Sequence, residues 1–84
     1  MREVRVTWYD ILFLHESYSL EDAKEHKPAE QVTYGQLLID EDWYIGVFST
    51  VDTTDEEGGF YRNVVYIPKG CIKKIEDIQV KEVE

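Results

Sequence analysis

Acidic residues are the groups in this sequence whose types and spacing come closest to a chemical site. Residues 52–59 read DTTDEEGG, and four carboxylates beside two glycines have the composition of a calcium-binding loop. The segment lacks the alternating ligand spacing and the distant bidentate glutamate of an EF-hand, so a solvated surface loop explains it better. The acidic turn at residues 40–42 is interpreted in the same way, as a polar hairpin turn. We therefore expect no metal site.

No group of nucleophile, base and carboxylate has the arrangement that catalysis needs. His15, Glu16 and Ser17 are consecutive, and consecutive residues of an extended chain point to alternate faces, whereas catalytic triads are assembled from distant positions. His26 is explained by a charge–dipole role at a helix C-terminus. The single cysteine, Cys71, cannot form an intramolecular disulfide and is interpreted as a small core residue. We expect neither an enzyme nor a bound cofactor.

The charge balance indicates a basic partner. The chain of 84 residues has 9 Lys and Arg against 18 Asp and Glu, a formal net charge of −9. Such a chain repels phosphate backbones at long range and attracts basic surfaces. We expect a basic protein surface as the partner and no direct contact with nucleic acid.

Aromatic side chains beside the carboxylates would anchor such a partner. We expect about two thirds of the aromatic residues to fill the core. Trp43 follows the acidic turn and Tyr61 follows the acidic loop, so these two are predicted to be exposed. The candidate partner-binding residues all belong to these two acidic and aromatic segments: Asp40, Glu41, Asp42, Trp43, Asp52, Asp55, Glu56, Glu57 and Tyr61.

A second interpretation remains open, in which the chain forms a homo-oligomer that holds a small ligand such as a signalling nucleotide. A thin core gains from association, and small open barrels have edge strands that invite pairing. The residues that would meet a phosphate are the clustered lysines Lys69, Lys73 and Lys74.

The elements that must position these residues are mostly strands. Apolar residues alternate from Val4 to Trp8, as in a half-buried strand. The apolar run at residues 11–14 (ILFL) is expected to follow a bend and to go deeper into the core. Residues 19–26 are predicted to form a short helix, capped by Ser19, that lies over a barrel end or edge.

The second half of the chain predicts a curved sheet. Residues 31–40 and 43–51 flank the acidic turn and are predicted to form a hairpin, in which Gly35 and Gly46 mark curvature or close backbone approach. Residues 60–67 are predicted to be a central return strand, because both of its faces are apolar. Pro68 ends that strand, and the following Lys-Gly turn leads into a short strand that closes the sheet.

Together these elements predict a mainly β fold with one domain at residues 1–80 and an acidic tail at residues 81–84. The predicted architecture is a small SH3-like or Sm-like five-stranded barrel, with one short α-helix inserted after the first strand. No segment approaches the roughly 18 consecutive apolar residues that span a bilayer, so we expect a cytoplasmic protein without membrane contact.

The segments VTWYD, VTYGQLLIDEDWYIGVFST and VVYIPKGCIKKIEDI resemble a set of small uncharacterised proteins encoded by tailed bacteriophages. The resemblance spans residues 4–78 and is most specific at the Ile-Pro-Lys-Gly segment. It implies a compact SH3-like fold and an accessory role in the host cytoplasm, and it carries no catalytic motif. The similarity to Sm-like barrels does not extend to RNA binding, because the basic and asparagine-rich loops of Sm proteins are missing here.

Overall fold

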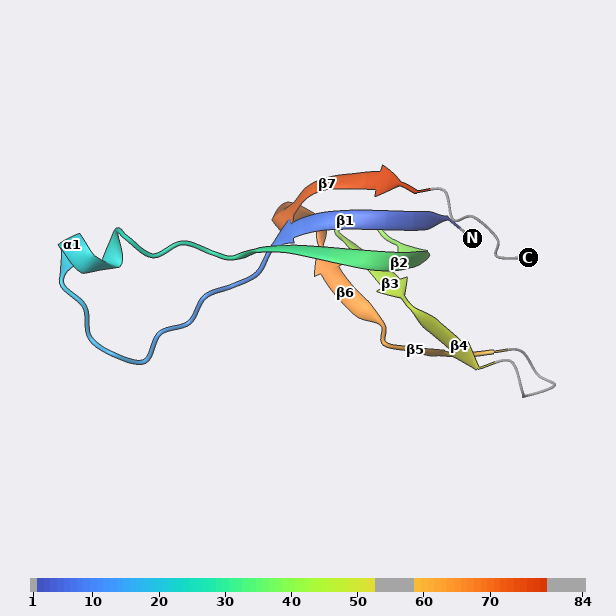
Figure 1. Ribbon diagram of the computed structural model, residues 1–84, viewed down its shortest axis with the longest axis horizontal. Coiled ribbons are helices and arrows are strands. Elements are labelled where there is room, and N and C mark those ends of the chain that lie inside the picture. The colour runs from blue at the N-terminus through green and yellow to red at the C-terminus, as the bar shows by residue number, and fades with distance from the viewer. Residues whose placement is uncertain (1, 53–58, 79–84) are drawn as a thin grey trace.

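A computed structural model of the chain describes residues 2–52 and 59–78. The elements are, in chain order, β1 (Glu3–Tyr9), α1 (Leu20–Ala23), β2 (Glu30–Asp40), β3 (Tyr44–Phe48), β4 (Thr50–Asp52), β5 (Phe60–Arg62), β6 (Val65–Pro68), the 3₁₀ turn η1 (Lys69–Cys71) and β7 (Ile72–Asp77). Five antiparallel strands form one sheet in the order β6-β3-β2-β1-β7, and β4 and β5 form a separate two-stranded ribbon (Figure 1). The predicted mainly β class is confirmed. In the described pairings β6 and β7 are the two edges of the sheet, and no ladder joins them.

The predicted alternation of β1 is confirmed by its burial. Val4 and Val6 are fully buried, whereas Arg5 between them is half-buried. Val6 faces Thr33 of β2 on one side and Ile75 of β7 on the other, so β1 is paired along both edges.

The core is small and mostly aliphatic. Its fully buried members are Val4, Val6, Ile45, Val47 and Ile67. The expectation that most aromatic residues fill the core is wrong: only Phe48 is buried, and Trp8 and Tyr44 are half-buried. A sheet of short strands with aliphatic inward positions leaves too little interior volume for large rings, so most of the rings remain in water.

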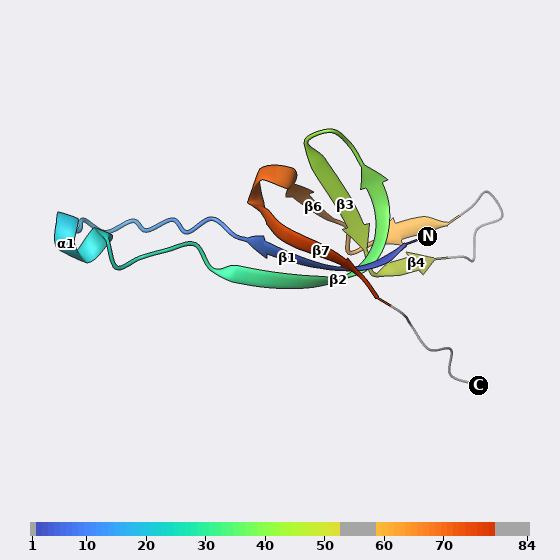
Figure 2. The same cartoon turned by 90° about the horizontal axis from the view of Figure 1, so that it is seen from above.

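Residues 10–29, called the arm below, leave the sheet and extend away from it (Figure 2). The arm gives the molecule a longest dimension of 57 Å and a radius of gyration of 17.1 Å, against about 12 Å for a compact chain of this length. The prediction that residues 11–14 enter the core is therefore wrong, because Ile11 is 85% and Phe13 is 74% exposed. No second layer of the described chain lies over this part to bury them.

The helix α1 lies at the end of the arm and contributes nothing to the core. Its predicted N-cap is confirmed, since Ser19 Oγ accepts a hydrogen bond from the Asp22 N–H at 3.2 Å. The helix is shorter than predicted and ends at Ala23, and none of its residues is buried. Its predicted position over a barrel end is wrong, because an apolar face of Leu20 and Ala23 alone is too small to hold it on the sheet.

The close backbone approach predicted at Gly35 is confirmed. A Cβ atom there would lie 2.5 Å from the carbonyl oxygen of Phe48 and 2.7 Å from Val47 Cγ1. Only glycine lets β2 curve this tightly against β3.

The predicted central return strand is wrong in its position and its continuity. The segment forms two short strands, of which β5 pairs with β4 alone and β6 pairs with β3 at the edge of the sheet. Asn63 separates them with a φ of 56°, a left-handed conformation that asparagine tolerates better than most residues. The apolar residues that were predicted to occupy both faces of one strand therefore belong to two strands, β5 and β6, with different neighbours.

The turn after Pro68 is confirmed, and it leads into β7, which pairs with β1. The Lys69 N–H donates to the Trp43 carbonyl oxygen at 2.7 Å and so ties η1 to the start of β3. Among the described residues, no helix is both long enough and apolar enough to cross a bilayer.

Candidate functional site

A pocket opens where β3 begins and β6 ends. Its lining consists of Trp43, Tyr44, Tyr66 and Pro68, and its volume is about 410 Å³. The two strands bring these residues together, because Tyr44 faces Pro68 and Gly46 faces Tyr66 in the antiparallel register. The volume lies in the range of ligand pockets, and the lining is aromatic and apolar.

Backbone hydrogen bonds hold the walls of this aromatic pocket in place. The Glu41 N–H donates to the Tyr44 carbonyl oxygen at 2.9 Å and closes the turn between β2 and β3. Lys69 binds the same region twice, through its N–H to the Trp43 carbonyl and through Nζ to Asp40 Oδ1 at 2.7 Å. A pocket that is formed before binding loses less entropy when a ligand enters it.

The rings present faces and edges to the solvent. Trp43 and Tyr44 meet at 4.6 Å between centroids in a T-shaped arrangement, and Tyr44 and Tyr66 lie 6.3 Å apart. Trp43 is 69% and Tyr66 is 60% exposed. Exposed tryptophan and tyrosine rings bind apolar side chains by contact and cationic side chains through the negative ring face.

The rim of the pocket carries negative charge. Asp40, Glu41 and Asp42 are exposed and directly precede Trp43. Asp40 is paired with Lys69, whereas Glu41 and Asp42 make no ion pair in the part of the chain that the structure describes. The rim therefore retains two uncompensated carboxylates next to an exposed indole ring.

The second predicted segment lies at the other end of β3. Tyr61 of β5 is 42% exposed and packs against Phe48 at 4.7 Å between ring centroids. Since Trp43 precedes β3 and Phe48 ends it, Trp43 and Tyr61 are separated by the length of the strand, about 15 Å. Asp52 lies in β4. Asp55, Glu56 and Glu57 lie outside the described residues, as does the predicted tail at 81–84.

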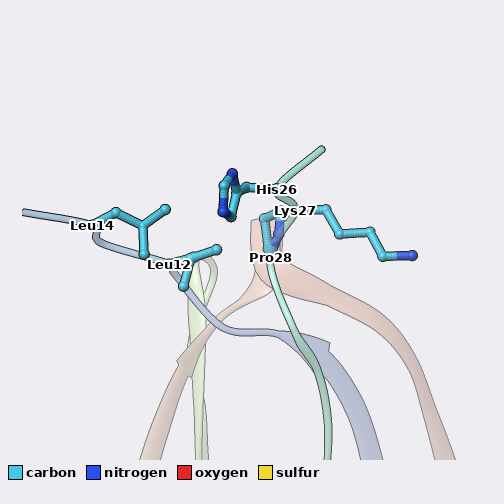
Figure 3. Close-up of a pocket in the computed structure, with 5 residues that line it drawn as sticks. All are labelled: Leu12, Leu14, His26, Lys27 and Pro28. Carbon is cyan, nitrogen blue, oxygen red and sulfur yellow. The ribbon is translucent and has the colours of Figure 1, made fainter. Parts of the chain in front are cut away.

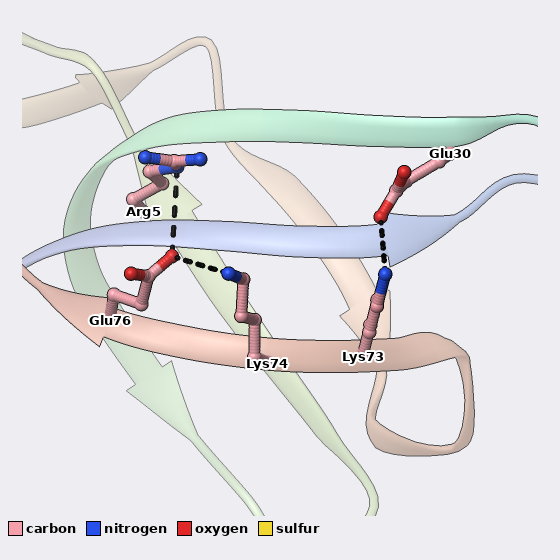
Figure 4. A network of polar contacts seen from close by, with 5 residues as sticks. All are labelled: Arg5, Glu30, Lys73, Lys74 and Glu76. Carbon is pink, nitrogen blue, oxygen red and sulfur yellow. Dashed lines mark hydrogen bonds and ion pairs between the residues drawn. The ribbon is translucent and has the colours of Figure 1, made fainter.

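The three lysines considered for phosphate binding are each paired with a different carboxylate. Lys69 contacts Asp40 at 2.7 Å. Lys73 contacts Glu30 at 3.1 Å and Lys74 contacts Glu76 at 3.5 Å, and Arg5 lies 3.7 Å from the same Glu76 (Figure 4). The hydrogen bond and the charge of Glu30 raise the pKa of Lys73. A phosphate would have to displace these carboxylates.

Tyr44, Tyr66 and Pro68 were not among the site residues predicted from the sequence. A signal for them existed, since Pro68 was predicted to end the strand that returns beside the Trp43 hairpin. The register between β3 and β6 was needed to show that this end lies next to Trp43.

The residues that were considered for catalysis and rejected from the sequence lie in two separate parts of the chain. His15, Glu16 and Ser17 are exposed on the arm, and Cys71 is half-buried. Within the described ranges, no three His, Cys, Asp or Glu side chains are grouped so that they could hold a metal ion.

No family model, no curated protein and no solved structure matches this chain. The resemblance to tailed-bacteriophage proteins therefore stays a prediction, and the geometry of the aromatic pocket carries the functional argument.

Proposed function

We propose that this chain is a non-enzymatic protein-binding module whose aromatic pocket takes a basic, partly apolar segment of a partner protein. The observation that carries the proposal is the pocket of Trp43, Tyr44, Tyr66 and Pro68 next to Glu41 and Asp42, whose carboxylates make no ion pair within the described residues. Interfaces are enriched in exposed tryptophan and tyrosine, and these residues dominate binding energies.

The ligand chemistry follows from the two parts of the site. An apolar or proline side chain of the ligand fills the space between the rings, and a neighbouring lysine or arginine meets the acidic rim or lies over the indole face of Trp43. The net charge of −9 steers such a ligand toward the chain and weakens its association as salt is added.

Within the mainly β class, we propose that the fold is an SH3-like or Sm-like barrel. Small barrels of these kinds use a strand that runs into one helical turn, followed by a last strand that pairs back with the first, and β6, η1 and β7 have this arrangement. From the resemblance to tailed-bacteriophage proteins, we further propose an accessory role for the chain. In this role it covers a basic surface of a host protein in the cytoplasm.

The test uses a displayed library of random peptides that is selected against the intact chain. We expect the enriched peptides to contain an apolar or proline anchor flanked by lysine or arginine. The Trp43→Ala variant should bind an enriched peptide at least tenfold more weakly in calorimetry, because a central aromatic anchor contributes about 2 kcal/mol or more.

Tyr34→Ala is the matched control, since Tyr34 is a comparably exposed aromatic residue, at 57%, on β2 and outside the pocket. Equal loss of affinity in both variants, or enriched peptides without basic residues, would contradict the proposal. The nucleotide-binding alternative has no specific observation in its favour, since its three lysines are each paired with a carboxylate.

A further inference from the structure

The arm carries a continuous apolar segment that the rest of the described chain covers only partly and on one side. Ile11, Leu12, Phe13 and Leu14 are 85%, 49%, 74% and 38% exposed. Together they expose on the order of 400 Å² of apolar surface. A standard interface buries about 800 Å² per partner, somewhat more than half of it apolar. Residues 11–14 therefore hold most of the apolar area that a stable dimer needs.

This segment has the geometry of a strand with one covered side. Exposure alternates along it, so that Ile11 and Phe13 point outward while Leu12 and Leu14 are less exposed. Leu12 and Leu14 lie opposite His26 and Pro28 across a shallow hollow of about 220 Å³ (Figure 3). A period of two is the alternation of an extended chain.

The backbone of residues 12–14 has no backbone hydrogen-bond partner in the described chain. The ladder between β1 and β2 continues only as far as the bond from the Asp10 N–H to the Ala29 carbonyl, at 2.9 Å. Pro28 has no N–H with which to extend it. Beyond this point no backbone–backbone hydrogen bond joins residues 11–18 to another described residue, although the Ile11 N–H donates to Asp10 Oδ1 at 2.9 Å. An extended, apolar segment with unpaired backbone groups is a template for pairing with another strand.

We propose that two copies of the chain dimerise through residues 9–15, paired as antiparallel strands about a two-fold axis at Leu12. The two-fold axis of such a ladder is perpendicular to the sheet, so side chains that face each other lie on the same side of it. An odd-numbered residue therefore faces an odd-numbered residue of the other copy, and an even-numbered residue faces an even-numbered one. With the axis at Leu12, Ile11 of each copy faces Phe13 of the other on the outer side. With the axis at Phe13, Asp10 would instead face Glu16, which like-charge repulsion disfavours.

The charges favour a second copy over a basic partner at this surface. The pairing segment at residues 9–15 contains a single carboxylate, Asp10, and its apolar part at residues 11–14 contains none that would recognise lysine or arginine. Two copies, each at −9, still repel each other at long range. Salt should therefore strengthen the dimer, whereas it should weaken binding at the aromatic pocket. The inference is independent of the proposed pocket function, and the opposite responses to salt separate the two.

Sedimentation velocity of the purified chain tests the dimer. We expect a monomer–dimer equilibrium that shifts toward dimer between about 0.1 M and about 1 M salt, where the Debye length falls from about 10 Å to about 3 Å. Phe13→Ser should weaken association at least tenfold. Leu20→Ser is the matched control, since Leu20 is similarly exposed at 72% but lies in α1 outside the pairing segment. A chain that stays monomeric up to near-millimolar concentration, or a dimer that Phe13→Ser leaves intact, would overturn the proposal.

Disulfide trapping tests the register in a Cys71→Ser background. In Leu12→Cys, the two new thiols face each other at about 4.5 to 5.5 Å between Cα atoms, within the range of a disulfide. In Leu14→Cys, each thiol faces Asp10 and lies about 13 Å from its own copy. We expect rapid oxidation to a covalent dimer in the first variant only. Trapping through Leu14→Cys but not Leu12→Cys would overturn the register and with it the proposal.

Discussion

Two small residues position the rings of the pocket. A Cβ atom on Gly46 would lie 3.3 Å from Ile39 Cβ and 3.4 Å from Tyr66 Cε1, so the ring of Tyr66 rests where a side chain would otherwise be. Pro68, opposite Tyr44, ends the ladder and exposes the wall of the pocket. The exposure of the rings therefore depends on two residues, Gly46 and Pro68, that have no polar side chain.

Gly35 provides a test of the close packing between β2 and β3. Gly35→Ala should lower the free energy of unfolding by about 2 kcal/mol, because the new Cβ would lie 2.5 Å from the carbonyl oxygen of Phe48, a backbone atom that cannot move aside easily. Gly70→Ala is the control, since nothing lies within 4 Å of a Cβ there, and it should change stability by less than about 0.5 kcal/mol. Urea unfolding of both variants measures the difference, and equal effects would contradict the packing account.

The ion pair between Arg2 and Asp77 predicts a dependence of stability on pH. The hydrogen bond from Arg2 Nε, at 2.6 Å, lowers the pKa of Asp77 in the folded chain. Because the folded pKa is lower than the unfolded one, the stabilisation is fully present above the ordinary aspartate pKa of about 3.9 and is lost as the pH falls through the folded pKa.

Asp77→Asn should therefore reduce stability slightly at neutral pH and not at strongly acidic pH. The effect is small, since both groups are exposed. Thermal unfolding across the acidic range gives the comparison. A difference between wild type and variant that is the same at all pH values would rule out the ionised pair as its cause.

At the scale of elements, the sequence predicted correctly those features that depend on neighbouring residues alone. The alternation of Val4 and Val6, the Ser19 cap and the turn after Pro68 were all read correctly, because each depends on residues that are close in the sequence. The exposure of Trp43 was predicted correctly for the same reason, since its acidic neighbours directly precede it.

The predictions that were wrong or missing depend on contacts between residues that are distant in the sequence. Residues 11–14 look like core strand in sequence, but burial needs an opposing layer, and the described chain supplies none. The left-handed Asn63 divides the predicted return strand, which no apolar pattern indicates. Tyr44, Tyr66 and Pro68 form a site only through the register between β3 and β6, two strands separated in sequence by β4 and β5.

The independence of arm and sheet can be tested by removing the arm. Replacing residues 10–29 by an Asn-Gly turn would join Tyr9 to Glu30, which already face each other at the end of the ladder. The free energy of unfolding should be unchanged or rise by up to about 2 kcal/mol, because closing a short turn costs less conformational entropy than closing a long connection. Chemical unfolding with circular dichroism checks this. Loss of cooperative unfolding would show that the arm supports the sheet.

At the scale of the whole molecule, the excess of acidic residues has two consequences. If the two proposals hold, it attracts a basic ligand to the pocket and opposes the approach of a second copy through residues 9–15. The two proposed interfaces should therefore respond to salt in opposite directions.

The contribution of the pocket rim can be separated from that of the net charge. The double substitution Glu41→Gln with Asp42→Asn should reduce the association rate of a basic peptide several-fold at low salt, since rim charges mainly affect that rate. Glu21→Gln with Asp22→Asn removes the same charge from α1 in the arm and should have a smaller effect. Stopped-flow fluorescence measures both. Equal effects would show that net charge alone steers the ligand.

The most direct test of the central claim, that the aromatic pocket binds a basic and partly apolar segment, is a chemical-shift titration of the ¹⁵N-labelled chain with a selected peptide. The account predicts that the indole N–H of Trp43 and the backbone amides of Tyr44, Tyr66 and Lys69 shift most, because they surround the pocket. The indole N–H of Trp8, which is half-buried and donates to Thr33 Oγ1 at 2.9 Å, should stay unchanged. Shifts confined to the arm, to β7 or to the ribbon of β4 and β5 would contradict it.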